Sequence, residues 1–286
     1  MKKLVALVLS LALSLSMVAC GSSEPAADSG ATNGTLKVAI SPDFAPMEFV
    51  DLSKSGQDKY VGFDVSLAKY IAEEMGMELE LMPMSFDACQ AAVSTGKVDM
   101  SISGFSYTPE RAENYNLSDY YYAGDNETEQ TVITMAENAG KYKTAADFAG
   151  VKVGAQTASL QESLANEQLV PAGAEIVIFS DINTGVLQLK KGDFDVIAVA
   201  QGNGEAIAAN NPDVALTEFL FDVDDESANN LILLQKGDDE LTAQVNEILA
   251  KAYAAGLYGE WYAEAQELAG IDTAADVSYD DEGNEI

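Results

Sequence analysis

The chain has 286 residues, among them 47 aspartates and glutamates, 15 lysines and arginines and no histidine, and its net charge is −32. Nucleic-acid binding is excluded, because the recognition of phosphates requires a basic surface. The lack of histidine excludes the usual zinc sites and histidine-based catalytic triads. We therefore expect no metal or other cofactor, and the acidic composition indicates a soluble domain outside the cell.

The first 19 residues have the composition of a signal peptide. Residues 1–3 carry two lysines, residues 4–19 form an apolar run, and Cys20 follows a small residue. A transmembrane helix is the alternative, but the run is short for a membrane span and contains serines. The segment resembles a bacterial lipoprotein signal, which implies a lipid on Cys20 and anchoring at the extracytoplasmic face of the cell membrane.

Residues 20–34 are rich in small and polar residues and show no periodicity, so we expect a flexible tether there. Strands are predicted at 36–39, 78–82 and 98–103. Helices are predicted between them, the first with an apolar face that includes Val65 and Ile71 and the second from Phe86 to Gly96. Alternating strands and helices predict a parallel α/β sheet.

Two further features of residues 36–103 have simple interpretations. With Cys20 lipidated, Cys89 would be the only free thiol of the mature chain, so no internal disulfide is possible, and we expect Cys89 to be a buried small residue. The segment that starts at Asp51 begins like a calcium loop, but Gly62 stands where a bidentate glutamate is required. A hairpin turn is the better prediction.

Arg111 is the only arginine in the chain. Thr108 is a good helix N-cap and Pro109 suits the first helical position, so a helix is predicted to start here with Arg111 in its first turn. Helical side chains lean toward the N-terminus, which would direct Arg111 over the small residues 103–106. Because a guanidinium holds a carboxylate with two parallel hydrogen bonds, Arg111 is a candidate carboxylate ligand.

The same order of elements recurs from Val151, which predicts a second, similar lobe. Strands are expected at 151–155, 175–179 and 194–200, with helices from about Ser159 and up to Lys191. A later strand at 231–234 precedes helices at 239–255 and 257–268, and residues 270–286 form an acidic tail.

From Leu36 to about Leu268 the chain resembles an extracytoplasmic solute-binding protein of the polar amino-acid ABC-transporter family, bacterial solute-binding protein family 3. The segments that carry the resemblance are 36–39, 46–49, 61–68, 96–99, 103–111, 118–122 and 236–237. It implies the bilobal periplasmic-binding-protein-like fold (type II), two α/β lobes joined by two hinge strands. Lobe 1 would comprise 35–123 plus 226–269, and lobe 2 would comprise 124–225.

The resemblance also implies the ligand contacts. Arg111 matches the arginine that binds the ligand carboxylate, and the other matching residues offer a hydroxyl, backbone contacts, an aromatic pair and a turn at a helix N-terminus. They are Ser106, Ser103, Gly104, Phe44, Phe86, Gln156, Ser159 and Leu160. Leu160 departs from the family, which usually has Thr or Ser there.

A larger departure is Ala200, where amino-acid binders generally carry an Asp that pairs with the ligand ammonium. An unpaired buried ammonium would be costly, so another partner must exist or the ligand lacks an ammonium. The open candidates are Gln201, Asn203, Glu205, Asp43 and the acids at 222–225. Gln201 is included among the expected ligand contacts.

The sequence therefore predicts a lipid-anchored, monomeric, non-enzymatic receptor that captures an amino acid or related small carboxylate and delivers it to an ABC permease. Two alternatives stay open at this point. A fold-related cleft enzyme of the dehydratase type would need a carboxylate such as Glu205 as its acid or base. A ligand-binding subunit of a sensor would need a signalling partner.

Overall fold

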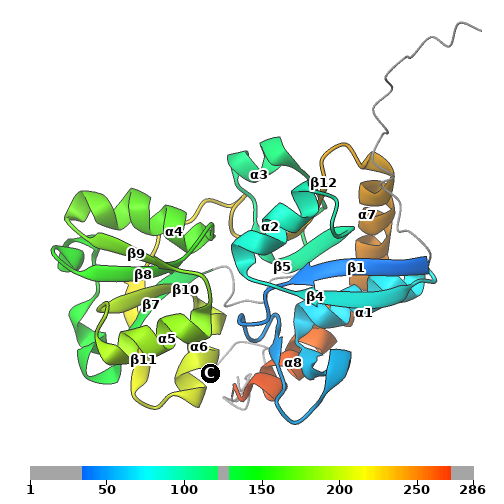
Figure 1. The fold of residues 1–286 in the computed structure, drawn as a ribbon. Helices are drawn as coiled ribbons and strands as arrows, with labels where there is room; N and C mark the ends of the chain where they lie inside the picture. The colour runs from blue at the N-terminus through cyan, green and yellow to red at the C-terminus, as the bar shows by residue number, and fades with distance from the viewer. Residues whose placement is uncertain (1–33, 122–128, 272–286) are drawn as a thin grey trace, which may run out of the picture.

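The computed structural model describes residues 34–121 and 129–271. These residues form two α/β lobes that lie side by side (Figure 1), and the predicted bilobal fold is confirmed. We call the part with the first sheet lobe 1 and the part with the second sheet lobe 2. The predicted signal peptide, the lipidation site Cys20 and nearly all of the predicted tether and tail lie outside the described residues.

The sheet of lobe 1 has the strand order β4-β1-β5-β12-β6. β1 is parallel to β4 and β5, whereas β12 is antiparallel to β5 and β6. The predicted parallel pairing of the strands at 36–39, 78–82 and 98–103 is therefore confirmed, and two antiparallel strands complete the sheet. The strands are β1 (Thr35–Ile40), β4 (Glu78–Pro83), β5 (Met100–Ser106), β6 (Tyr115–Leu117) and β12 (Asn230–Gln235).

Helices cover both faces of this sheet. The apolar face of α1 packs with α7 and α8 on one side, and α2 covers the other side. The predicted hairpin between Asp51 and Gly62 is formed by β2 (Phe49–Val50) and β3 (Tyr60–Val61), with η2 (Gly56–Lys59) in its loop. The helices are α1 (Phe63–Glu74), α2 (Phe86–Ser94), α3 (Pro109–Asn114), α7 (Asp239–Ala254) and α8 (Leu257–Ala269).

The sheet of lobe 2 has the order β11-β7-β10-β8-β9. β8 is parallel to β9 and β10, and β7 is antiparallel to β10 and β11. The strands are β7 (Gln130–Met135), β8 (Lys152–Gln156), β9 (Glu175–Phe179), β10 (Val196–Ala200) and β11 (Val214–Leu220).

Every residue of β10 is buried, because helices cover this sheet on both faces. Val196 and Ala198 pack in the cluster that includes Leu164 of α4, and Ile197 and Val199 pack on the opposite side. The helices are α4 (Leu160–Leu164), α5 (Ile182–Lys191) and α6 (Gln201–Asn210), with the short turns η3 (Ala136–Lys141), η4 (Ala145–Phe148), η5 (Ala165–Leu169) and η6 (Val170–Ala172). The sequence did not predict β6, β7, β11 or α6.

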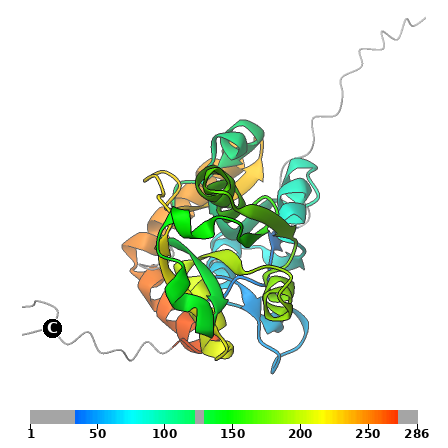
Figure 2. The same ribbon diagram turned by 90° about the vertical axis from the view of Figure 1, so that its left-hand side faces the viewer.

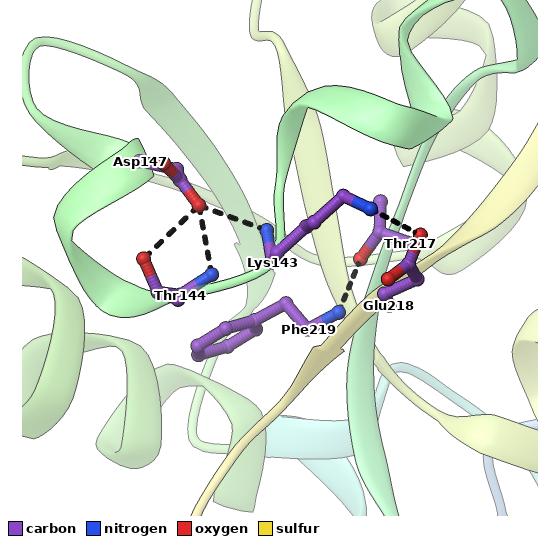
Figure 3. Close-up of polar contacts among 6 residues, drawn as sticks. All are labelled: Lys143, Thr144, Asp147, Thr217, Glu218 and Phe219. Atoms are coloured by element: carbon purple, nitrogen blue, oxygen red, sulfur yellow. Dashed lines mark hydrogen bonds and ion pairs between the residues drawn. The ribbon is translucent and has the colours of Figure 1, made fainter.

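The exposed edge of lobe 2 shows how local polar contacts fix the turns (Figure 3). Asp147 accepts hydrogen bonds from the backbone N–H groups of Lys143 (3.0 Å) and Thr144 (2.8 Å) and so closes the capping box of η4. The Lys143 ammonium lies 2.6 Å from a carboxylate oxygen of Glu218 in β11. Such exposed ion pairs stabilise a fold by only about 0–1 kcal/mol, so this contact adds little to the stability of lobe 2.

The two lobes are in direct contact. Viewed from the side of lobe 2, the second lobe lies in front of the first (Figure 2). The side-chain amide of Asn203 in α6 donates to the carbonyl of Ala45 at 2.9 Å, and the Ile182 N–H at the start of α5 donates to the Asp43 carboxylate at 2.7 Å. No helix among the described residues is long and apolar enough to cross a membrane.

Gly62 precedes α1 with φ +119°, a conformation that residues with a side chain rarely adopt. A Cβ at this position would lie 2.3 Å from the carbonyl oxygen of Met47. We expect Gly62→Ala to lower the free energy of unfolding by about 3 kcal/mol or more, measured by urea denaturation. Gly76→Ala is the matched control: Gly76 also has positive φ, but a Cβ there meets open space, so the expected cost is about 1 kcal/mol.

Candidate functional site

A cavity between the lobes brings together most of the residues predicted to contact a ligand. It contains about 480 Å³ of space, part of it open to solvent, and both lobes line it. The predicted residues that line it are Phe44, Phe86, Ser103, Gly104, Ser106 and Arg111 of lobe 1 and Gln156, Ser159 and Leu160 of lobe 2. Gln201 does not line it; its side-chain amide donates to Glu205 at 3.3 Å.

Arg111 is positioned by the start of α3. The Thr108 hydroxyl accepts from the Arg111 N–H at 3.1 Å, which caps the helix as the sequence predicts. The guanidinium folds back over the end of β5, where Nη1 donates to the Ser106 carbonyl at 2.7 Å. Nη2 donates across the lobe boundary to the Ala158 carbonyl at 2.9 Å, and Nε donates to Gln90 at 3.4 Å.

The charge of Arg111 is buried and forms no ion pair with a carboxylate of the described residues. Arg111 is 4% exposed, and the three groups that accept hydrogen bonds from its guanidinium are all neutral. The guanidinium carbon lies 5.5 Å from the ring centre of Phe86 and 5.2 Å from that of Phe105. The two aromatic faces offset part of the cost of burying the positive charge. Burial lowers the pKa of Arg111 to about 10. A buried cation in this state favours an anionic ligand.

Ser103 and Gly104 contact the interior of lobe 1. The Ser103 hydroxyl accepts from the Ser41 N–H at 3.1 Å and donates to the Glu48 carboxyl group. The Gly104 N–H donates to Asp64 at 2.8 Å, in a backbone conformation with φ +56°. This N–H is therefore engaged within the protein, which differs from the backbone contact to a ligand expected for Gly104.

Glu48 and Asp64 form a buried pair of carboxyl groups beside Ser103 and Gly104 of β5, and neither is exposed to solvent. Burial, and then the charge of Asp64, raise the pKa of Glu48 well above its usual value, and burial raises the pKa of Asp64 to about 6. The two carboxyl groups are close enough to hydrogen-bond to each other, which requires a proton between them. Asp64 also accepts from the Tyr121 hydroxyl at 3.1 Å, next to the segment that leads to lobe 2.

The sequence prediction missed the role of this pair, although both acids lie in segments that carried the family resemblance. The signal was present: Glu48 stands between Met47 and Phe49, and Asp64 stands between Phe63 and Val65. A single acid among large apolar residues at the start of a helix or directly before a short strand indicates a buried carboxyl group.

In lobe 2, the end of β8 and the start of α4 face Arg111. Ala158 has φ +62°, and its carbonyl accepts from both Arg111 and Gln90. The Ser159 hydroxyl accepts from the Glu162 N–H at 3.0 Å and caps α4. Leu160 presents an apolar side chain to the cavity, so this turn contributes backbone groups and an apolar surface.

Two of the candidates for an ammonium partner line the cavity. Asp43 from lobe 1 is 8% exposed and Asn203 from lobe 2 is 1% exposed. Glu205 and the acids at 222–225 do not line it. Ala200, at the end of β10, lines the cavity. The cavity wall is therefore apolar at the position where the family resemblance predicts an acid.

Comparisons with known proteins agree with this architecture. The family model for bacterial extracellular solute-binding proteins, family 3, matches residues 36–265, and the chain belongs to this family. The arginine-binding extracellular protein ArtP of Bacillus subtilis is 32% identical over 250 residues, which cover 87% of this chain and 92% of ArtP.

Two solved structures extend the comparison. One is the amino acid ABC transporter substrate-binding protein AbpA from Streptococcus pneumoniae, bound to L-arginine. It superposes with a TM-score of 0.75 at 33% identity, and the match covers 84% of this chain and 97% of AbpA. The other is the ancestral amino acid-binding protein AncCDT-1, a precursor of cyclohexadienyl dehydratase. It has a TM-score of 0.68 at 31% identity, and the match covers 81% of this chain and 95% of AncCDT-1.

The Glu48–Asp64 pair makes stability depend on pH. Both pKa values are higher in the folded than in the unfolded protein, so the folded state binds more protons above pH 4 and stability falls as pH rises through 6. We expect Glu48→Gln, which keeps a donor to Asp64, to reduce the loss of unfolding free energy between pH 5 and 7.5 by about 1–3 kcal/mol.

Urea denaturation at the two pH values measures this difference. Glu80→Gln removes an acid from an exposed position in the sheet of lobe 1 and is the control, for which we expect the wild-type pH dependence. An equally steep dependence in Glu48→Gln would contradict the shared proton.

Proposed function

We propose that this protein binds an amino acid or a related small carboxylate between its two lobes and delivers it to an ABC permease. The observation that carries the proposal is Arg111, a buried guanidinium that lines the cavity without a carboxylate partner among the described residues. A ligand carboxylate supplies the missing negative charge in the bidentate geometry that a guanidinium favours. ArtP and AbpA, both arginine binders by name or bound ligand, support the assignment.

The lobes close over the ligand because both contribute to its site. Ligand-driven closure requires contacts that improve when the lobes meet. In this structure Arg111 of lobe 1 already reaches the Ala158 carbonyl of lobe 2, and the cavity has walls from both lobes. A ligand carboxylate at Arg111 would join the two sides at this point, and the permease would recognise the closed form.

The remaining contacts follow from the lining of the cavity. Ser106 offers a hydroxyl beside Arg111, Phe44 and Phe86 offer aromatic surfaces to the ligand side chain, and Ser159 and Leu160 close the site from lobe 2. We further propose that the mature chain is a monomer held by a lipid on Cys20 at the outer face of the cell membrane, which keeps it near its permease.

A cleft enzyme is the second candidate, because AncCDT-1 is described as the precursor of a dehydratase. Asp43 is the carboxylate in the cavity wall, and burial raises its pKa to about 6, in the range suited to proton transfer. Proton NMR of a saturating ligand incubated with the protein tests this candidate. Recovery of the unchanged ligand is the expected result for a binding protein.

Arg111→Lys tests the carboxylate site. A lysine keeps the charge but loses the planar pair of donors, so we expect binding of the preferred amino acid to weaken by about 2–5 kcal/mol in isothermal titration calorimetry. The carboxamide derivative of the same amino acid provides the control, because it lacks the charge that Arg111 binds and should be affected much less. Equal affinity of wild type and variant for the free acid would show that Arg111 is not the carboxylate ligand.

A further inference from the structure

A second groove lies between the lobes, on the side of α5, α6 and α8, and we call it the outer groove. It contains about 1490 Å³ of space, part of it open to solvent, and it shares only Asp43 and Asn203 with the cavity. The hairpin strand β2 and its loop line it from lobe 1, α5 and α6 line it from lobe 2, and the last residues of α8 complete its wall. None of the predicted ligand contacts lines it, so the outer groove is distinct from the candidate ligand site.

Exposed apolar side chains gather in the outer groove. Leu52 is 92% exposed, Leu187 is 59% exposed and Leu268 is 45% exposed, and all three line it. They belong to the hairpin loop of lobe 1, to α5 and to α8, so segments far apart in the sequence build one apolar surface. Phe49 and Ile207, which are partly buried, add to this surface. Single exposed apolar residues are normal, but several that gather in one place indicate an interaction site.

The chain leaves α8 at this groove. α8 ends at Ala269, and Gly270 caps it with φ +76°. Leu268 and Ala269 line the outer groove, and the Asn210 amide of α6 donates to the Ala269 carbonyl at 2.9 Å. The end of α8 is thereby held against lobe 2. Residues 272–286, which lie outside the described residues, follow from this point.

The sequence after α8 contains two closely spaced apolar residues, Val277 and Tyr279. Because they are two positions apart, they share one face of an extended segment, a conformation that β-branched and aromatic residues favour. Val277 lies six residues after Ile271, and six extended residues span at most about 20 Å. Both side chains can therefore reach the groove at which the segment starts.

Two arguments favour this segment over a separate partner as the occupant of the groove. A covalently linked segment has an effective concentration of roughly millimolar, so a few apolar contacts suffice to dock it. A second copy of the chain would bring another net charge of −32 to this face, and like charges oppose association.

The charge beside the groove also fits the segment. Lys190 lies three residues after Leu187 on α5, and its ammonium lies 2.8 Å from the side-chain oxygen of Asn211, which lines the groove. Lys190 also pairs with Asp213 at 2.8 Å, but an ammonium has three donors and can bind further carboxylates. The acids at 280–282 follow the two apolar residues and can approach this cation.

We propose that residues 272–282 of the same chain dock in the outer groove. Val277 and Tyr279 are the anchors, and they pack against exposed leucines of both lobes, Leu52 and Leu187. The docked segment contacts both lobes, so it stabilises their arrangement and removes apolar surface from water. This inference goes beyond the proposed function and does not depend on the identity of the ligand.

Chymotrypsin cleavage after Tyr279 in the full-length chain tests the proposal. Cleavage requires the segment to leave the groove, so its rate follows the population of the undocked form. Release of residues 280–286 is measured by mass spectrometry, and a synthetic peptide of residues 272–286 gives the rate for the same bond without the fold. We expect release from the chain to be at least about 10-fold slower than from the peptide.

Two groove variants and two controls connect this protection to the groove. Leu187→Asp and Leu52→Asp place a negative charge on the apolar surface, so each should raise the rate to within about 3-fold of that of the peptide. Leu220→Asp on β11 and Tyr253→Asp on α7 change exposed residues, one in each lobe, that do not line the groove. Both controls should keep the wild-type rate, and thermal melting checks that all four variants are folded.

A disulfide pair locates the segment, in a chain in which Cys20→Ser removes the other thiol outside the described fold. Leu187→Cys combined with Val277→Cys should form an intramolecular disulfide at least about 10-fold faster than Leu220→Cys combined with Val277→Cys. Cys89 is buried and does not compete.

Release from the intact chain as fast as from the peptide overturns the proposal, as do equal cross-linking rates for the two cysteine pairs. Protection that persists in both groove variants also overturns it. Protection that disappears on dilution assigns the groove to a second copy of the chain and likewise overturns docking within one chain. Protection that the groove variants remove and the controls keep supports the proposal.

Discussion

The burial of one guanidinium is the constraint around which this structure is organised. Arg111 lies between the aromatic rings of Phe86 and Phe105 and gives its donors to neutral carbonyl and amide oxygens, one of them in the opposite lobe. Folding therefore carries the cost of an unpaired buried charge. The ligand carboxylate that we propose at Arg111 would offset this cost on entering the cavity, which would couple binding to the arrangement of the lobes.

The acids of lobe 1 support this site in two different ways. Asp64, hydrogen-bonded by Glu48, binds the Gly104 N–H and the Tyr121 hydroxyl, so it ties the ligand-facing end of β5 to the segment that leads to lobe 2. Asp43 reaches the cavity itself and is held by groups of lobe 2. Both acids therefore come from lobe 1, and groups of lobe 2 complete the surroundings of Asp43.

Sequence patterns predicted the elements with strong local signals. The apolar face of α1, the capped start of α3 and the strands β1, β9 and β12 agree with their predicted ranges within about two residues. The antiparallel strands β7 and β11 were not predicted, because a strand that pairs with a distant neighbour has no periodicity of its own beyond a short apolar run. The helix α6 was missed because its two glycines and its asparagines weaken the helical signal.

The sequence by itself determined which residues form the proposed carboxylate site: the single arginine, its capped helix start and the small residues before it are all local features. It also showed that position 200 lacks the expected acid, but it left seven possible replacements. The tertiary structure narrows these candidates, because only Asp43 and Asn203 among them line the cavity, and this depends on which polar atoms from segments 160 residues apart meet there. Burial and the pairing of polar atoms are properties of that meeting, and no local sequence pattern encodes them.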